Sequence, residues 1–351
     1  MSDRSRVRAF VALCTSRLRE YYREPEVLFW GFVFPLLLSA ALAVAFRERP
    51  PEPSRVAVIT GPGAASVMDA FERAPLVEGA LSSAAAAGRD LRMARVDLVV
   101  VPPPTADDVV EYRHDPSRPE AGIARSRVDD ALQRAAGRQD VLAARDVQTG
   151  DPGGRYVDFL VPGLVGLNLM SAGMWGVGFV LVDMRIKKLL RRLLATPMRA
   201  SDFLAAQMAT RVAFTIFEVV VLLGFGHLAL GVPLRGGVLA ILVVSVLGGL
   251  TFAGLGLLVA SRARRIETVT GLMNVVMLPM FIASGVFFSV DRFPAAVQPL
   301  LRALPLTALN EALRAVTLEG ASLWSQGPHL LLLAAWGIVC FGVGLRLFRW
   351  S

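Results

Sequence analysis

Long apolar runs separated by short charged segments make up most of this chain. A helix that crosses a bilayer needs about 20 consecutive apolar residues, and six runs of roughly that length occur. We expect membrane-spanning helices at Val27–Phe46, Phe159–Val182, Val212–Leu230, Val238–Ala260, Val269–Val290 and Leu330–Leu347. The pattern predicts a mainly α-helical polytopic membrane protein, in which residues 156–351 form a core of the second to sixth spans.

Residues 47–155 follow a different pattern, in which charges of both signs are mixed and no apolar run is long enough to span a membrane. The apolar runs at 55–60 and 96–101 are bounded by Gly or Pro, which is typical of buried strands. Residues 64–73 and 121–146 have the pattern of helices. We therefore expect a small extracytoplasmic α/β domain between the first and second spans.

Residues 1–26 precede the first span and place apolar side chains on one helical face, with arginines on the others. We expect an amphipathic helix along the cytoplasmic membrane surface, ended by Pro25. A secretory signal peptide is the alternative, because an apolar stretch follows and Ala43-Val44-Ala45 resembles a cleavage site. The length of the preceding segment favours the membrane-surface helix.

The connector at 183–207, between the second and third spans, is strongly cationic. Its leucines and Ile186 fall on one face of a helix, and its arginines and lysines occupy the other faces. Pro197 ends this helix because proline cannot donate the next backbone hydrogen bond, and Ser201 can cap a second helix. One interpretation is an interfacial helix that meets anionic lipid headgroups. The other is a docking surface for a soluble partner.

The segment 291–327 is amphipathic and too polar to be a further span. Pro294, Pro299 and Pro305 divide it into short pieces. Irregular backbone at membrane depth is tolerated only where protein or water covers it. We expect an extracytoplasmic re-entrant hairpin that caps a pathway.

Composition and charge agree with a membrane protein. The 351 residues are 54% hydrophobic, with a mean hydropathy of +0.53 and a formal net charge of +8. The basic residues lie beside the apolar runs, as topology signals do, and this excludes a nucleic-acid-binding protein. With six spans, the short-loop arginines fall on the side of both termini, and only Arg235 lies in the short loop opposite. We expect both termini to be cytoplasmic, in a bacterial inner membrane.

Few residues suggest chemistry. The two cysteines, Cys14 and Cys340, and three scattered histidines give neither a disulfide framework nor a metal site. Glu218 lies near the middle of the third span, where an ionised carboxylate costs upward of ~2.5 kcal/mol unless it has a partner. Glu218 either lines a substrate path or pairs with a basic or polar neighbour. Asn168 and Asn274 are weaker substrate-path candidates, because such amides often join helices.

Two motifs resemble those of ABC-2-type exporter permeases, and the resemblance covers nearly the whole chain. The first is the segment 284–314, with Ser-Gly and an aromatic pair, a proline-bounded turn, and Glu-Ala-Leu-Arg. The second is Leu193-Leu194-Ala195-Thr196-Pro197, at the position of the connector that docks on the ATPase. Where family members often have an acidic, glycine-containing turn, this chain has Asp183 followed by Arg185-Ile186-Lys187-Lys188. The 47–155 insertion is similar to the subgroup with a large loop after the first span.

The resemblance implies a translocation path made by a homodimer, or by a pair with a paralogous permease, and driven by a separate ATPase that binds ATP and Mg²⁺. This chain itself is expected to bind no cofactor beyond membrane lipids and to be no enzyme, since GPGAAS at 61–66 lacks the Gly-Lys-Ser/Thr ending of a phosphate loop. The expected ATPase-coupling residues are Arg185, Leu189, Leu190, Arg191, Arg192, Leu193, Thr196 and Pro197. The expected extracytoplasmic gate comprises Phe287, Phe288, Pro294, Pro305 and Glu311.

Two other functions fit the sequence less well. One is an ion- or proton-coupled transporter that acts alone with Glu218 as its coupling residue, although such proteins usually show internal repeats or several intramembrane charges. The other is a membrane-anchored sensor, for which six spans exceed what anchoring requires.

Overall fold

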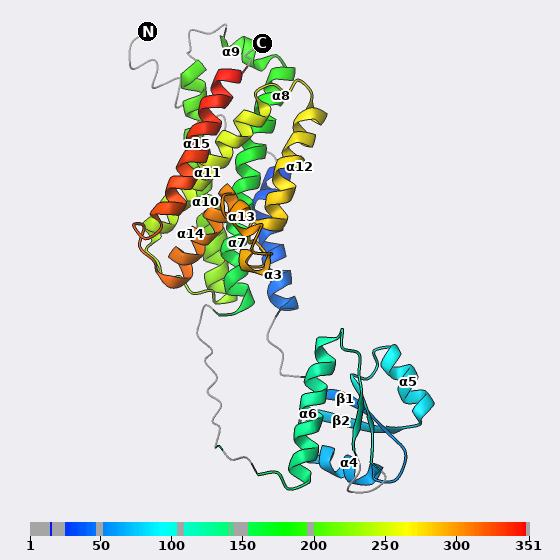
Figure 1. Ribbon diagram of the computed structural model, residues 1–351. Coiled ribbons are helices and arrows are strands. Elements are labelled where there is room, and N and C mark those ends of the chain that lie inside the picture. The colour runs from blue at the N-terminus through cyan, green and yellow to red at the C-terminus, as the bar shows by residue number, and fades with distance from the viewer. Residues whose placement is uncertain are drawn as a thin grey trace. The chain divides into compact units, whose positions relative to one another are not determined.

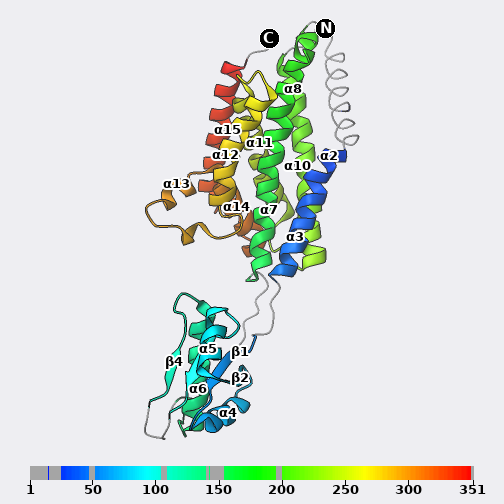
Figure 2. The ribbon, with the colours of Figure 1, turned by 90° about the vertical axis from the view of Figure 1, so that its right-hand side faces the viewer.

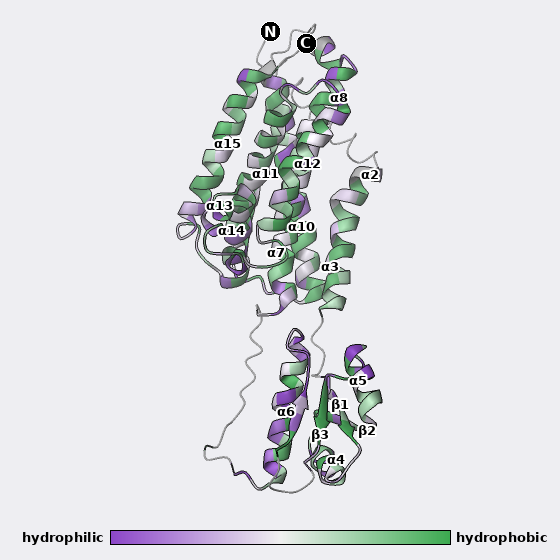
Figure 3. Cartoon of the chain, turned by 45° about the vertical axis from the view of Figure 1, so that its right-hand side comes forward, coloured by the Kyte–Doolittle hydropathy of each residue, from purple (hydrophilic) through white to green (hydrophobic). Residues whose placement is uncertain are grey.

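The computed structural model describes residue 15 and residues 25–46, 52–103, 109–139, 142, 154–194 and 200–348. The chain divides into two compact units, one made by Glu48–Gln148 and the other by Met1–Arg47 together with Thr149–Ser351 (Figure 1). The first is a small α/β unit and the second is a helical bundle. Figure 3 shows that apolar residues dominate the bundle and that the small unit carries many polar ones.

The small unit has a four-stranded sheet of order β2-β1-β3-β4. The central β1 pairs in parallel with β2 and β3, and β4 is antiparallel to β3. Its elements are β1 (Ser54–Ile59), α4 (Ala64–Glu72), β2 (Val77–Ser82), α5 (Ala84–Arg92), β3 (Leu98–Val101), β4 (Glu111–Arg113) and α6 (Pro119–Ala135).

Side-chain alternation along the two central strands builds a core on each face of the sheet. Val56 and Val58 of β1, with Leu98 and Val100 of β3, face α4 and α6. The intervening residues of these strands face α5 on the other side. The strand predictions at 55–60 and 96–101 and the helix at 64–73 are confirmed within a few residues. The helix predicted at 121–146 ends earlier, at Ala135.

The described part of the bundle unit contains five helices long and apolar enough to cross a membrane, at Tyr156–Ile186, Asp202–Leu230, Val238–Ala260, Ile266–Ala283 and Gly327–Leu347. A shorter apolar helix covers Phe29–Ala45. Its elements are α2 (Pro25–Leu28), η1 (Phe29–Val33), α3 (Phe34–Ala45), α7 (Tyr156–Gly173), η2 (Met174–Phe179), α8 (Val180–Ile186), α9 (Leu189–Leu194), α10 (Ala200–Leu230), α11 (Val238–Ala260), α12 (Ile266–Ala283), η3 (Val290–Arg292), α13 (Gln298–Arg302), α14 (Pro305–Glu319) and α15 (Gly327–Leu347).

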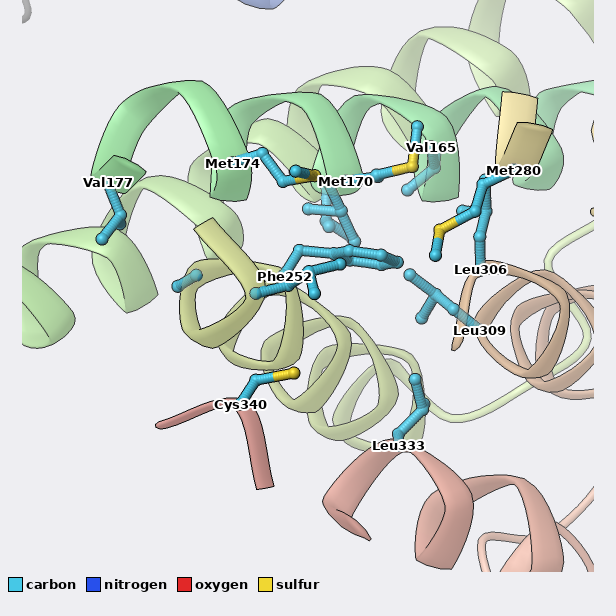
Figure 4. Packing of buried hydrophobic residues seen from close by; sticks show 14 of the residues in the cluster. Val165, Met170, Met174, Val177, Phe252, Met280, Leu306, Leu309, Leu333 and Cys340 are labelled. Carbon is cyan, nitrogen blue, oxygen red and sulfur yellow. The ribbon is translucent and has the colours of Figure 1, made fainter. Parts of the chain in front are cut away.

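Helix α11 lies at the centre of the bundle and packs against α7, α10, α14 and α15. It is apolar all round, and none of residues 244–260 is exposed, whereas Val238, Leu239 and Val243 near its start are exposed. Phe252 of α11 is fully buried, and Figure 4 shows it among the side chains of Met170 and Leu309, which come from α7 and α14. The close packing needs small residues: a Cβ atom on Gly178 would lie 2.6 Å from the Gly256 carbonyl oxygen.

The end of the predicted fifth span is wrong. We expected this span to reach Val290, but α12 ends at Ala283 and the chain turns at Gly285, whose φ of +72° favours glycine. The segment that follows contains the short pieces η3 and α13 and then the longer helix α14. Pro305 stands at the first position of α14, where its missing N–H costs nothing, and α14 is buried against α7, α11 and α15.

The cationic connector also differs from the prediction. A helix was expected to run without a break through Ile186 and Leu194, but α8 ends at Ile186 and α9 begins at Leu189. Lys188 lies between them with a φ of +58°, a left-handed conformation that helices do not continue through. Ser201 lies inside α10 rather than before it. Figure 1 places α8 and α9 at one end of the bundle and α14 towards the other, and Figure 2 shows the same arrangement of α8 and α14.

Candidate functional site

A cavity of about 950 Å³ lies between the first two helices of the bundle and α10. Its wall includes Trp30, Gly31 and Phe34 from η1 and α3, a strip of α7, η2 and α8, and four residues of α10. Asn168, predicted as a substrate-path residue, is among the lining residues. A cleft of this size takes a drug-sized molecule.

Both π-helical segments of the bundle line this cavity. Segment η1 contributes Trp30 and Gly31, and η2 contributes Trp175, Gly176 and Phe179. In each, a side-chain amide of a neighbouring helix donates to a glycine carbonyl: Asn168 Nδ2 to Gly31 at 3.2 Å, and Gln207 Nε2 to Gly176 at 3.1 Å. Single π turns occur frequently at functional sites.

The charged residues of the cavity wall are held in ion pairs. Arg211 forms two hydrogen bonds with Glu218, at 2.7 and 3.3 Å, and both side chains are almost completely buried. Glu218 does not line the cavity, whereas Arg211 does. At the other end of the lining, Lys187 Nζ lies 2.8 Å from Asp183 Oδ2. Glu218 therefore has the basic partner that its position demands, and the partner lies on its own helix.

Asn274 stands apart from these residues. It is exposed on α12 and is not among the residues that line the cavity. The structure thus brings Asn168 into the cavity, places Glu218 behind its wall, and leaves Asn274 elsewhere.

Among the coupling residues, Arg185 has a structural role. Its guanidinium donates to the carbonyl oxygens of Ala260 and Ala263, at 3.0 and 2.6 Å, and lies 4.7 Å from the Phe348 ring centre. A cation at the C-terminus of a helix is stabilising, because the last carbonyls there lack partners. Arg185 thus joins α8 to the end of α11.

The remaining coupling residues follow on α9 and beyond it. Leu190 is buried, Leu189 is partly buried and Arg192 is exposed. The backbone of Arg191 and Leu193 belongs to α9. Thr196 and Pro197 lie outside the described residues.

The residues predicted as a gate lie near one end of the bundle. The backbone oxygen of Phe287 accepts a hydrogen bond of 2.9 Å from Tyr156, and its ring packs 5.2 Å from that of Phe281. Phe288 and Pro294 are exposed, whereas Pro305 is buried. Glu311 Oε2 lies 3.1 Å from His329 Nε2.

Two residues of the 284–314 motif that were not singled out fix the turn after α12. Asn310 Nδ2 donates to the Ser284 carbonyl at 3.0 Å. Arg314 donates to the carbonyls of Gly285 and Phe159, the latter at 3.0 Å, and its guanidinium lies 3.5 Å from the Phe159 ring centre. Asn310 and Arg314 are four residues apart, so they lie on one face of α14. This spacing is the sequence signal from which their shared role could have been predicted.

Comparison with known proteins gives matches over most of the chain. The family model described as ABC-2 family transporter protein matches residues 25–346. The probable multidrug ABC transporter permease YbhS of Escherichia coli strain K12 is 23% identical over 360 residues, covering 95% of this chain and 94% of that protein. Nodulation protein J of Rhizobium meliloti is 28% identical over 197 residues, covering 55% of this chain and 74% of that protein.

Proposed function

The chain belongs to the ABC-2 family of transporter proteins, and from that premise we propose that it is the permease subunit of an exporter driven by a separate ATPase. The long apolar helices make it a multi-pass membrane protein. The named permease similar to it along nearly its whole length is a transport component. Export as the direction of transport is part of our proposal.

The observation that carries the proposal is the short helix α9, separated from the second span by the left-handed turn at Lys188. A helix set off by such a turn presents a compact surface at the end of the bundle, while its Leu190 is buried in the bundle core. Arg192 is exposed on it, and Lys188 is exposed at its start. We propose that α9 and the residues that follow it dock on the ATPase.

Arg185 provides a route from that docking surface into the bundle. Its hydrogen bonds join α8, just ahead of α9, to the last carbonyls of α11. Movement imposed on α9 by closure of the ATPases would therefore reach the central helix through short, direct contacts. ATP and Mg²⁺ would be bound by the partner, and this chain would have no ATPase site of its own.

The same arrangement supports a topology. The end of the bundle that carries Arg185 and α9 is proposed to face the cytoplasm, together with both termini, in a bacterial inner membrane. Arg235, in the short loop opposite, has its backbone N–H bonded to Thr317 of α14, at 2.8 Å. The helix over Pro25–Ala45 is proposed as a sixth span, and residues 48–148 as an extracytoplasmic domain.

A complete translocation path is proposed to need two permease chains, either identical or paralogous. The outer faces of α12 and α15 are largely exposed and apolar, with Leu272, Val275 and Leu278 on α12 and Leu331 and Ile338 on α15. Such faces suit lipid or a second copy.

Co-purification of this chain with its cognate ATPase tests the docking assignment. We expect the double change Arg191→Glu and Arg192→Glu to reduce the recovered ATPase strongly while membrane insertion persists. The matched control is Arg89→Glu with Arg92→Glu, the same charge change on exposed residues of α5. Undiminished ATPase recovery with the α9 variant would refute the assignment.

A further inference from the structure

The cavity between α3, α7 and α10 is lined by a group of aromatic side chains, which distinguishes it from a packing defect. Aromatic rings from several segments meet there: Trp30 and Phe34 from the first helix, Trp175 and Phe179 from η2, and Phe214 from α10. Trp30 and Phe34 are 62% and 40% exposed, so they form a rim through which a molecule can enter from the side. Aromatic walls favour flat apolar ligands, because ring faces and edges attract one another.

The charge of the lining selects against ions. Lys187 is paired with Asp183, and Arg211 is paired with the buried Glu218. An ion that replaced one partner of the Arg211–Glu218 pair would break a buried ion pair, which costs heavily. The Lys187–Asp183 pair is partly exposed and lies at the end of the lining.

The lining also offers hydrogen-bonding atoms that the described part of the chain does not use. Asn168 Nδ2 is bound to Gly31, but Asn168 Oδ1 and Ser171 Oγ make no hydrogen bond with any described residue. Ser171 follows Asn168 by three positions, which puts both on one face of α7. These two oxygen atoms are therefore available to a polar group of a ligand.

We propose that this cavity binds an uncharged aromatic amphiphile, with its flat apolar body between Trp30 and Trp175 and a single hydroxyl or amino group at Asn168 and Ser171. Such a group can donate a hydrogen bond to the side-chain oxygen of Asn168 and accept one from the hydroxyl of Ser171. Each π turn places a tryptophan in the cavity lining next to a glycine whose carbonyl oxygen accepts a hydrogen bond from a side-chain amide. That this molecule is transported cargo, taken up laterally from the membrane, rests on the function proposed above.

Binding is tested with 1-aminoanthracene, a fluorescent neutral amphiphile, and the full-length chain in phosphatidylcholine nanodiscs, with protein-free nanodiscs subtracted. We expect saturable binding that the cavity-filling change Ala172→Trp weakens about tenfold or more. Ala172 lines the cavity. The control is Ala335→Trp, the same change at an exposed position of α15, which is expected to bind as the unchanged chain does. Equal binding by both variants overturns the proposal.

The polar contact is tested by pairing the probe with 1-methylanthracene, which has nearly the same shape and no hydrogen-bonding group. The unchanged chain is expected to prefer the amine by about fivefold, which is the usual worth of one hydrogen bond. Ser171→Ala should abolish this preference and leave the Asn168–Gly31 bond intact. Tighter binding of anthracene-1-carboxylate than of the amine would show that the cavity selects an anion, and would also overturn the proposal.

Energy transfer from tryptophan to the bound probe tests the same site without the Ala172→Trp variant, and so remains usable if that variant fails to fold. Excitation of tryptophan should sensitise emission from the bound probe, and Trp175→Phe should reduce this emission. Trp324→Phe, at a residue that is 94% exposed, should leave it unchanged. Equal reductions by the two changes would contradict the assigned site. All these measurements omit the ATPase, so a failure to bind leaves the permease assignment standing, and a failure of ATPase docking leaves the cavity assignment standing.

Discussion

The guanidinium of Arg211 and the carboxylate of Glu218 form a two-bond ion pair across two turns of α10. Removing one charge leaves the other buried without its partner, which costs roughly 3–5 kcal/mol. We expect Glu218→Gln to lower the thermal unfolding temperature markedly in detergent. The combined change Arg211→Met and Glu218→Leu should recover most of that loss, because neither charge then remains.

The control for this pair is Glu267→Gln, the same change at an exposed carboxylate of α12. An unfolding temperature for Glu218→Gln equal to that of the control would contradict a structural pair. Transport driven by a pH gradient in vesicles without ATPase, and lost in Glu218→Gln, would instead favour a coupled transporter that acts alone.

Arg314→Lys should destabilise the turn after α12. The guanidinium of Arg314 bonds the carbonyls of Phe159 and Gly285 and stacks on the Phe159 ring, and an ammonium group cannot make these contacts together. We expect a loss of about 2–3 kcal/mol in thermal or denaturant unfolding. Arg302→Lys, at a half-exposed arginine, is the control, and an equal effect of the two changes would count against the assigned role.

Gly178→Ala tests the close approach of η2 and α11. The added Cβ atom would lie 2.6 Å from the Gly256 carbonyl oxygen, so backbone must move. Overpacking of this kind costs about 1–3 kcal/mol. Gly342→Ala, on α15 with no atom of the described residues within 4 Å of the new Cβ, should be neutral. The measurement is the unfolding temperature of each variant. Equal values for the two would show that η2 and α11 are less tightly packed than described.

Tyr112 of the small unit should titrate late. Burial, and then the Asp129 carboxylate at 3.1 Å, raise the pKa of Tyr112 to about 12. A raised folded-state pKa means that this tyrosine adds stability below its ordinary pKa of about 10, and that this stability is lost as the pH rises towards 12. Ultraviolet titration should show a late component that Tyr112→Phe removes and Asp129→Asn moves to lower pH. A titration curve that Tyr112→Phe leaves unchanged would contradict the raised pKa of Tyr112.

The periodic and apolar elements were predictable because each carries its own signal. The fourth span was expected at the residues that α11 occupies, and the strands at 55–60 and 96–101 were found from short apolar runs. Strand β2 was missed because VEGALS has no apolar alternation, and it is held by pairing with β1. The fifth span was drawn too long because apolar residues continue past the turn at Gly285.

The candidate site was predictable only where a single residue carried its own sequence signal, such as a polar side chain inside an apolar span. Asn168 stood out as an amide inside a span, and it does line the cavity. The π turns depend on contacts between helices, which no single helix reveals. A Trp-Gly pair is no sufficient signal, because Trp336-Gly337 has the same sequence within the regular helix α15. Arg185 was predicted as a coupling residue, but its hydrogen bonds to carbonyl groups some 75 residues away could not be predicted from the sequence.

The enclosure of α11 limits which parts of the bundle can move. Over residues 244–260, where none of its side chains is exposed, α11 cannot tilt unless several neighbouring helices separate from it together. Among the described residues, many side chains of the first helix and of α12 are exposed, so displacement of these two helices disturbs fewer contacts. Any cycle of opening and closing within this chain should therefore leave α11 as a stationary axis and be carried by the peripheral helices around it.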